Sequence, residues 1–330
     1  ALGQIITDRA VSPVSAAPRN PEVTAGLLPG GAGLTPVADE PTLPLAGSGQ
    51  MTPNTHPQAA AGGDSGRCAQ TGAFPYQPRL EELNTALERA AAGQLGPAYP
   101  QMGTIPAGWP NLVEVPATIP CVLLKAIASV ESDWHQAEYA TPRGSSGYPL
   151  MPPNGCAYGV GQIATGMQQP GEIDRTLQYR IAHDYVTNAA YSAKLLAEKW
   201  RITPAIGSND PAIAEDWYYA VWAYNTFSWI NNPNNPRWDP SRPPFTGRPT
   251  DFHYPYQELV WGFAANPPAP GGAPLWTAVP LTLPDRSSFP TNPDTPPGRV
   301  SNDPQPVHSS TCPAVTIAGA FMPWVARSAP

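Results

Sequence analysis

The chain has 330 residues, of which 41% are hydrophobic, so it can form one large domain or two modest ones with a real core. Its formal net charge of -7 argues against a nucleic-acid partner, because nucleic-acid binding requires a basic surface. The sequence contains no run of about 18 apolar residues, which argues against a membrane-spanning helix.

The two ends of the chain differ in composition from its middle. Residues 1–66 are rich in Ala, Gly, Pro and Thr, and residues 266–330 are richer still in proline, which supplies 46 residues of the whole chain. This composition predicts extended arms with polyproline II geometry. Such arms cannot order themselves by burial. We therefore expect them to lie on the core of the same chain, on sister copies or on other proteins.

The middle of the chain, residues 67–265, carries the helical patterns. Apolar residues recur at steps of three and four in "PRLEELNTALERAAAG", "IPCVLLKAIASVESDW" and "HDYVTNAAYSAKLLAEKW". A fourth pattern, "DPAIAEDWYYAVWAYN", opens with Asp210 as a predicted N-cap and Pro211 at the first helical position. Four amphipathic helices and no convincing strand pattern predict a mainly α domain.

The cysteines number four and have no CxxC spacing, which favours two disulfides in an exported protein over a zinc site. Three connectivities are possible, and four buried free thiols are the alternative. We favour Cys121–Cys156 with Cys68–Cys312, since the second bond would tie both ends of the chain onto one body. The chain starts with Ala and no charged leading segment, as a processed exported protein would, although a shortened chain would start likewise.

Two carboxylates lie close together in the second helical pattern, at Glu131 and Asp133. A helix turns about 100° per residue, so their side chains point about 160° apart and do not form a pair. Glu131 lies at the shoulder of the apolar stripe, where partial burial would raise its pKa and keep it protonated near neutral pH, as a general acid requires. The alternative is a boundary glutamate whose carboxyl group simply reaches water.

Three motifs occur in order around this glutamate. They are the pair Glu131–Ser132 at a helix end, the turn "GVGQ" that ends at Gln162, and "AYN", which contains Tyr224 and Asn225. Over roughly residues 115–230, they resemble the soluble lytic transglycosylases of the goose-type lysozyme superfamily. The resemblance implies a lysozyme-like helical fold and a bacterial enzyme, secreted or in the cell envelope, that acts on peptidoglycan glycan strands.

The resemblance also implies a role for each motif residue. Glu131 would protonate the glycosidic oxygen between N-acetylmuramic acid and N-acetylglucosamine, then act as base on the C6 hydroxyl of the muramic residue, giving a 1,6-anhydro product. The substrate supplies its own nucleophile, so neither a second carboxylate nor a cofactor is expected. Gln162 would hydrogen-bond a sugar substituent. Tyr224 would aim its hydroxyl at Glu131, with Asn225 supporting the turn, and Ser132 would be a groove or supporting hydroxyl.

The sequence departs from the family pattern at two places. The stretch between Glu131 and Gly159 is long, and Gly161 stands where family members often have Met. Two other functions also fit the sequence. One is a structural or assembly protein of an extracellular or envelope complex that retains the fold and binds protein partners along its arms. The other is a hydrolytic muramidase.

Overall fold

The computed structural model describes residues 68–69, 72–103, 105–106, 114–115, 118–152, 155–248, 250–302 and 304–309. The predicted arm at residues 1–66 and the cysteine at position 312 lie outside the described residues.

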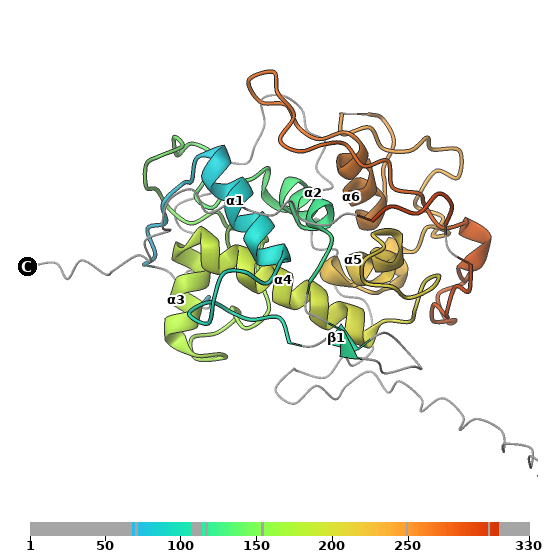
Figure 1. Cartoon of the computed structure of the whole chain (residues 1–330), viewed down its shortest axis with the longest axis horizontal. Coiled ribbons are helices and arrows are strands. Elements are labelled where there is room, and N and C mark those ends of the chain that lie inside the picture. The colour runs from blue at the N-terminus through green and yellow to red at the C-terminus, as the bar shows by residue number, and fades with distance from the viewer. Residues whose placement is uncertain are drawn as a thin grey trace, which may run out of the picture. The chain divides into compact units, whose positions relative to one another are not determined.

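Six α-helices form most of the regular structure of this part of the chain (Figure 1). They are α1 (Leu80–Ala91), α2 (Cys121–Ser132), α3 (Arg175–His183), α4 (Tyr185–Ile202), α5 (Tyr218–Asn225) and α6 (Tyr256–Ala265). Three short 3-10 helices span Glu215–Trp217, Trp229–Asn231 and Arg286–Ser288. One antiparallel pair, β1 (Ile105–Pro106) and β2 (Glu114–Val115), places Ile105 opposite Val115. The prediction of a mainly α domain is confirmed.

The apolar patterns correspond to α1, α2, α4 and α5, and the structure adds α3 and α6. The predicted start of the fourth pattern is wrong, because Asp210 does not cap a helix. Its carboxylate accepts a hydrogen bond from the backbone N–H of Ala212 at 2.8 Å, which forms a local turn of the kind that competes with helix formation. The helix itself begins at Tyr218, after the 3-10 helix Glu215–Trp217.

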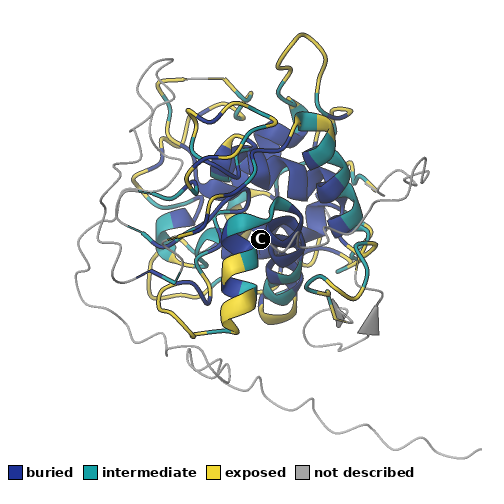
Figure 2. Ribbon diagram, turned by 90° about the vertical axis from the view of Figure 1, so that its left-hand side faces the viewer, coloured by how far each residue is buried: buried dark blue, intermediate teal, exposed yellow. Residues whose placement is uncertain are grey.

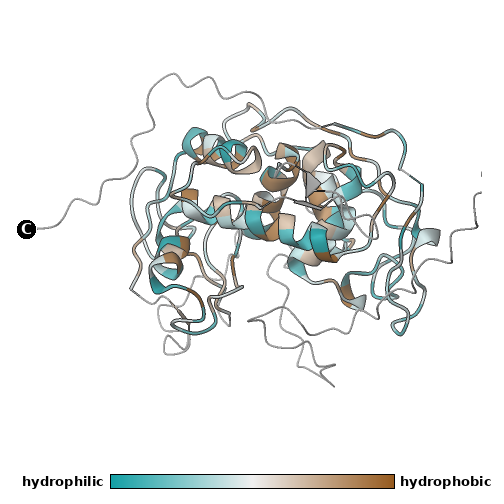
Figure 3. Ribbon diagram, turned by 60° about the horizontal axis from the view of Figure 1, so that its bottom comes forward, coloured by the Kyte–Doolittle hydropathy of each residue, from teal (hydrophilic) through white to brown (hydrophobic). Residues whose placement is uncertain are grey.

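The helices pack around α2 and α4. Helix α2 contacts α1 and α6, α4 contacts α1, α3 and α5, and α5 contacts α6. Buried residues concentrate in these central helices, as Figure 2 shows. Hydrophilic and hydrophobic residues alternate along several of the helices in Figure 3, as amphipathic helices require. Within the part of the chain that the structure describes, no helix is long and apolar enough to cross a membrane.

The proline-rich segment after α6 lies on the helical core over its described part, residues 266–302 and 304–309 (Figure 1, orange to red). The indole of Trp276 stacks on that of Trp134, with ring centroids 5.7 Å apart and planes inclined by 12°. Buried side chains of the segment join the main core: Trp276, Leu281, Phe289 and Val300. Three surfaces were expected to hold this segment: the core of the same chain, sister copies or other proteins. The structure shows contact with the core of the same chain.

A buried glutamate at the start of the α5 region fastens this segment. The Oε1 atom of Glu215 accepts a hydrogen bond from the backbone N–H of Thr282 at 3.1 Å and lies 2.6 Å from Nδ1 of His308. Its Oε2 atom accepts from the backbone N–H of His308 at 2.8 Å. Glu215 is fully buried, and a buried carboxylate needs such donors to offset its lost hydration.

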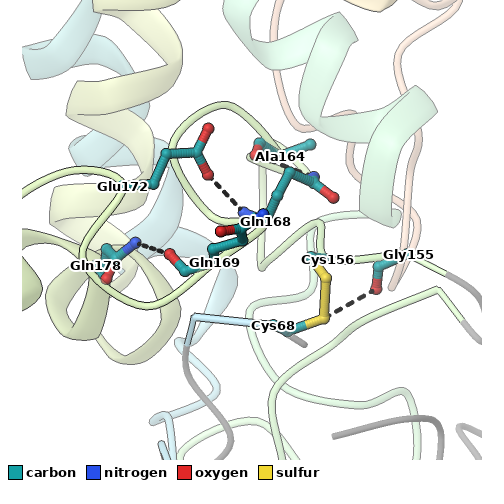
Figure 4. The surroundings of a disulfide bond; sticks show 8 residues. All are labelled: Cys68, Gly155, Cys156, Ala164, Gln168, Gln169, Glu172 and Gln178. Atoms are coloured by element: carbon teal, nitrogen blue, oxygen red, sulfur yellow. Dashed lines mark hydrogen bonds between the residues drawn. A yellow bond between two sulfur atoms is a disulfide. The ribbon is translucent and has the colours of Figure 1, made fainter. Parts of the chain in front are cut away.

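A disulfide joins Cys68 to Cys156 across 88 residues of sequence (Figure 4). The prediction of a disulfide is confirmed, but both favoured pairings are wrong, since Cys156 bonds to Cys68 and not to Cys121. Cys121 is not a free thiol either. The bond sits beside the loop after the turn motif, with Cys68 Sγ 4.0 Å from the carbonyl oxygen of Gly155. The number and spacing of cysteines could not show which sulfur atoms meet, because that depends on how the helices pack.

Candidate active site

Glu131 is the one residue of α2 that is not fully buried. Its Oε1 atom accepts a hydrogen bond at 2.6 Å from the hydroxyl of Tyr256, the first residue of α6. Burial raises the pKa of Glu131 to about 8, although the hydrogen bond from Tyr256 acts in the opposite direction. The carboxyl group is therefore mostly protonated at neutral pH while retaining some contact with solvent.

The chain turns sharply just after this glutamate. Asp133 is exposed and adopts a left-handed backbone conformation, with φ of 47°, and Trp134 follows with φ of 63°. A bulky residue rarely adopts positive φ, so this turn is strained. The buried indole of Trp134 compensates by donating from Nε1 to the carbonyl oxygen of Lys125 at 3.1 Å. Asp133 is not among the causes of the Glu131 pKa shift, which agrees with the predicted separation of the two carboxylates.

The turn motif at residues 159–162 comes close to α4, and this close approach leaves no room for a side chain at position 161. A Cβ atom at Gly161 would lie 1.9 Å from Ser192 Oγ and 2.8 Å from the hydroxyl oxygen of Tyr224. Gly159 has φ of 68°, and a Cβ atom there would lie 2.3 Å from Oε1 of Gln136. A side chain at either position would push the turn away from its neighbours.

Buried polar side chains fix this turn against α2. Ser132 donates from Oγ to the carbonyl oxygen of Val160 at 2.8 Å, and Gln136 accepts from the backbone N–H of Val160 at 3.1 Å. The backbone N–H of Gly161 donates to Oδ1 of Asn188 on α4 at 2.8 Å. Ser132 is only 1% exposed, so of its two predicted roles the structure shows the supporting hydroxyl.

The prediction that Tyr224 directs its hydroxyl at Glu131 is wrong. Tyr224 lies in the last turn of α5 and donates to the carbonyl oxygen of Gly161 at 2.9 Å, whereas the hydroxyl that reaches Glu131 belongs to Tyr256. The carboxyl group still acts on Tyr224 electrostatically. Burial and the nearby Glu131 both raise the pKa of the Tyr224 phenol. Tyr224 therefore holds the turn, and Tyr256 holds the carboxyl group.

The other two motif residues flank this arrangement. Gln162 is half-buried, has φ of 44°, and donates from Nε2 to the carbonyl oxygen of Gly159 at 2.9 Å, so it folds back over its own turn. Asn225 ends α5 and accepts from Nδ2 of Asn231 at 3.0 Å through its Oδ1 atom. This bond joins Asn225 to Asn231 and not to the turn motif, so the supporting role of Asn225 stays a prediction.

Sequence reasoning missed two tyrosines of the site. Tyr256 lies beyond the three motifs, and the available signal was "PYQELVWGFAA", where Pro255 precedes an apolar helical pattern. Tyr139 lies in the long stretch before Gly159, and its ring is 4.9 Å from that of His135. Burial raises the pKa of the Tyr139 phenol to about 12, with Asp133 and Glu131 adding to the effect.

Comparisons with protein-family models, curated proteins and solved structures return no match. Among the residues described, no cluster of three or more His, Cys, Asp or Glu side chains could hold a metal ion. The chemistry that the geometry allows is that of one carboxyl group, protonated near neutral pH and held by a tyrosine hydroxyl. Such a group can deliver a proton to a bound oxygen atom and take one back.

Proposed function

We propose that the chain is a lytic transglycosylase that cleaves peptidoglycan glycan strands, with Glu131 as its acid and base on a goose-type lysozyme-like fold. The observation that carries the proposal is the state of Glu131. It has a pKa of about 8, lies at the end of a buried helix, and is held by Tyr256. A general acid with a pKa near the working pH is protonated often enough to act and acidic enough to transfer its proton.

The reaction needs two proton transfers through the same carboxyl group. Glu131 first donates its proton to the glycosidic oxygen, and the bond from that oxygen to C1 of the muramic residue breaks. The resulting carboxylate then takes the proton of the C6 hydroxyl as its oxygen bonds to C1. The products are an alcohol and a 1,6-anhydro ring, no water is consumed, and Glu131 ends protonated. Tyr256 stabilises the carboxylate between the two transfers through its hydrogen bond.

The electrostatic surroundings of Glu131 favour this reaction over hydrolysis by two carboxylates. Two-carboxylate glycosidases place the groups about 5 to 9.5 Å apart. At such distances a second carboxylate would raise the pKa of the first by repulsion. The shift of Glu131 has burial and the Tyr256 hydrogen bond as its causes, and no carboxylate of the described residues is among them.

The test is the digestion of purified peptidoglycan followed by mass spectrometry of the products. We expect anhydro-muramyl ends and a loss of at least about 100-fold in Glu131→Gln. The rate should fall as pH rises through about 8, because the ionised carboxyl group has no proton to give. The matched control is Asp133→Asn, which removes the exposed carboxyl group two residues away and should keep full activity.

Each other outcome points to a different function. Products with added water would identify a muramidase. Equal activity in Glu131→Gln and the parent protein would remove Glu131 from the mechanism. A folded parent protein without glycan-cleaving activity would favour the assembly protein.

A further inference from the structure

A buried asparagine connects the end of α5 to the start of α6. Asn231 closes the 3-10 helix Trp229–Asn231 and is fully buried. Its side-chain Nδ2 donates to Oδ1 of Asn225 at 3.0 Å, and its Oδ1 accepts from the backbone N–H of Tyr256 at 3.3 Å. One amide group thus bonds both to the last residue of the "AYN" motif and to the residue whose hydroxyl holds Glu131.

The backbone of Asn231 strengthens the same connection. Its carbonyl oxygen accepts from Nε2 of Gln257, the second residue of α6, at 2.7 Å. The next residue of α6, Glu258, pairs with Arg242, both of them buried, with 2.7 Å between Arg242 Nε and Glu258 Oε2. The start of α6 is therefore held on two sides by groups shielded from water, where hydrogen bonds are strongest.

The contacts form one continuous path between the turn motif and the acid. Tyr224 bonds the turn at Gly161, Asn225 follows Tyr224 at the end of α5, Asn231 joins α5 to α6, and Tyr256 bonds Glu131. Without the Asn231 amide, α5 and α6 could shift relative to each other, and the 2.6 Å bond to Glu131 depends on their spacing.

We infer that Asn231 is a positioning residue that sets the hydrogen bond between Tyr256 and Glu131 by joining the "AYN" motif to the start of α6. Its catalytic meaning rests on the proposed function, whereas the coupling between Asn231 and Glu131 does not. The titratable groups around Glu131 come from three elements, Tyr224 on α5, Tyr256 on α6 and Tyr139 after α2, and only Tyr256 bonds directly to Asn231.

The test measures the pKa of Glu131 directly, by carbon-13 NMR of glutamate carboxyl groups in the full chain, with Glu131→Gln to assign the signal. Tyr256→Phe removes a hydrogen bond that favours the carboxylate, so the pKa should rise by about 1. Asn231→Ala should raise it in the same direction, and the double variant should titrate like Tyr256→Phe alone, because both changes break the same bond.

Asn232→Ala is the matched control. Asn232 is a buried neighbour that bonds to the carbonyl oxygen of Pro290 at 3.2 Å and to the backbone N–H of Asn234, so its loss should leave the pKa of Glu131 unchanged. If Asn231→Ala does not fold, Asn225→Ala, at a half-buried position, removes the partner of Asn231 and should also raise the pKa.

An unchanged pKa in the folded Asn231 or Asn225 variant would overturn the inference, as would a fully additive double variant. Activity on peptidoglycan separates this result from the proposed function. If the variants raise the pKa of Glu131 but the parent protein cleaves no glycan, the coupling between Asn231 and Glu131 stands and the proposed transglycosylase function is rejected. In an active protein, Asn231→Ala should lower kcat more than it changes KM and move the alkaline limb of the rate profile upward in pH.

Discussion

Replacing Glu131 with Gln should stabilise the protein, and the gain should depend on pH. The raised pKa means that the fold opposes ionisation of this carboxyl group. Gln has nearly the same shape, stays neutral, and can still accept the hydrogen bond from Tyr256 through its carbonyl oxygen. The substitution therefore removes the cost of a buried charge and little else.

The size of the effect follows from the two pKa values. Below the unfolded-state value of 4.5 the group is protonated in both states, and Gln gains nothing. Between 4.5 and about 8 only the unfolded chain loses its proton, so stability falls as pH rises. Near pH 7 the cost reaches about 3 kcal/mol, from about 2.5 pH units at about 1.36 kcal/mol each. Solvent at the half-buried carboxyl group makes this an upper value.

The assay is urea unfolding of the parent protein, Glu131→Gln and the control Asp133→Asn at pH 4, 7 and 9. Glu131→Gln should match the parent near pH 4 and exceed it at pH 7 and 9, while Asp133→Asn stays close to the parent throughout. A stability difference that is the same at all three pH values would refute the reasoning, because burial of an ionisable group cannot produce it.

Two further substitutions test the packing around the site by urea unfolding. Gly161→Ala should destabilise the protein by about 1 to 3 kcal/mol, because the added methyl group overlaps Ser192. Adding Ser192→Gly should recover part of the loss. Unchanged stability in Gly161→Ala would contradict the close approach. Arg242→Met should lower the free energy of unfolding by about 3 to 5 kcal/mol, because it removes the partner of the buried Glu258 carboxylate. Arg237→Met, at an exposed position, should lower it far less. Equal losses for the two arginines would rule out that account.

The helical class was predictable because α1, α2, α4 and α5 carry apolar residues at helical spacing. Helix α3 is only nine residues long and has few apolar residues, so the pattern was too short to stand out. Helix α6 is apolar on most sides and buried, and such a helix lacks the amphipathic period on which the prediction depends. The late start of α5 reflects a local hydrogen bond at Asp210 that competes with the helix.

The acid of the site could be selected from the sequence, but its partner could not. Glu131 stands out because it is the only acidic residue of an apolar helix, and that signal lies within one segment. The choice between Tyr224 and Tyr256 depends on how α5 and α6 pack against α2, which no local pattern encodes. The same limit applies to the disulfide, where packing brings the sulfur atoms of Cys68 and Cys156 together.

The contacts of Glu215 and Trp276 mean that the unit that folds is longer than the unit that carries the motifs. A fragment ending at residue 265 would keep every motif residue, yet Glu215 would lose the donors at Thr282 and His308, and Trp134 would lose its stacked ring. A buried carboxylate without donors costs several kcal/mol. During synthesis, Trp134 can gain its stacked ring only after Trp276 has left the ribosome, and Glu215 can gain all its donors only after His308 has done so. A protease cut between α6 and Thr282 would weaken these contacts while leaving every motif residue in place.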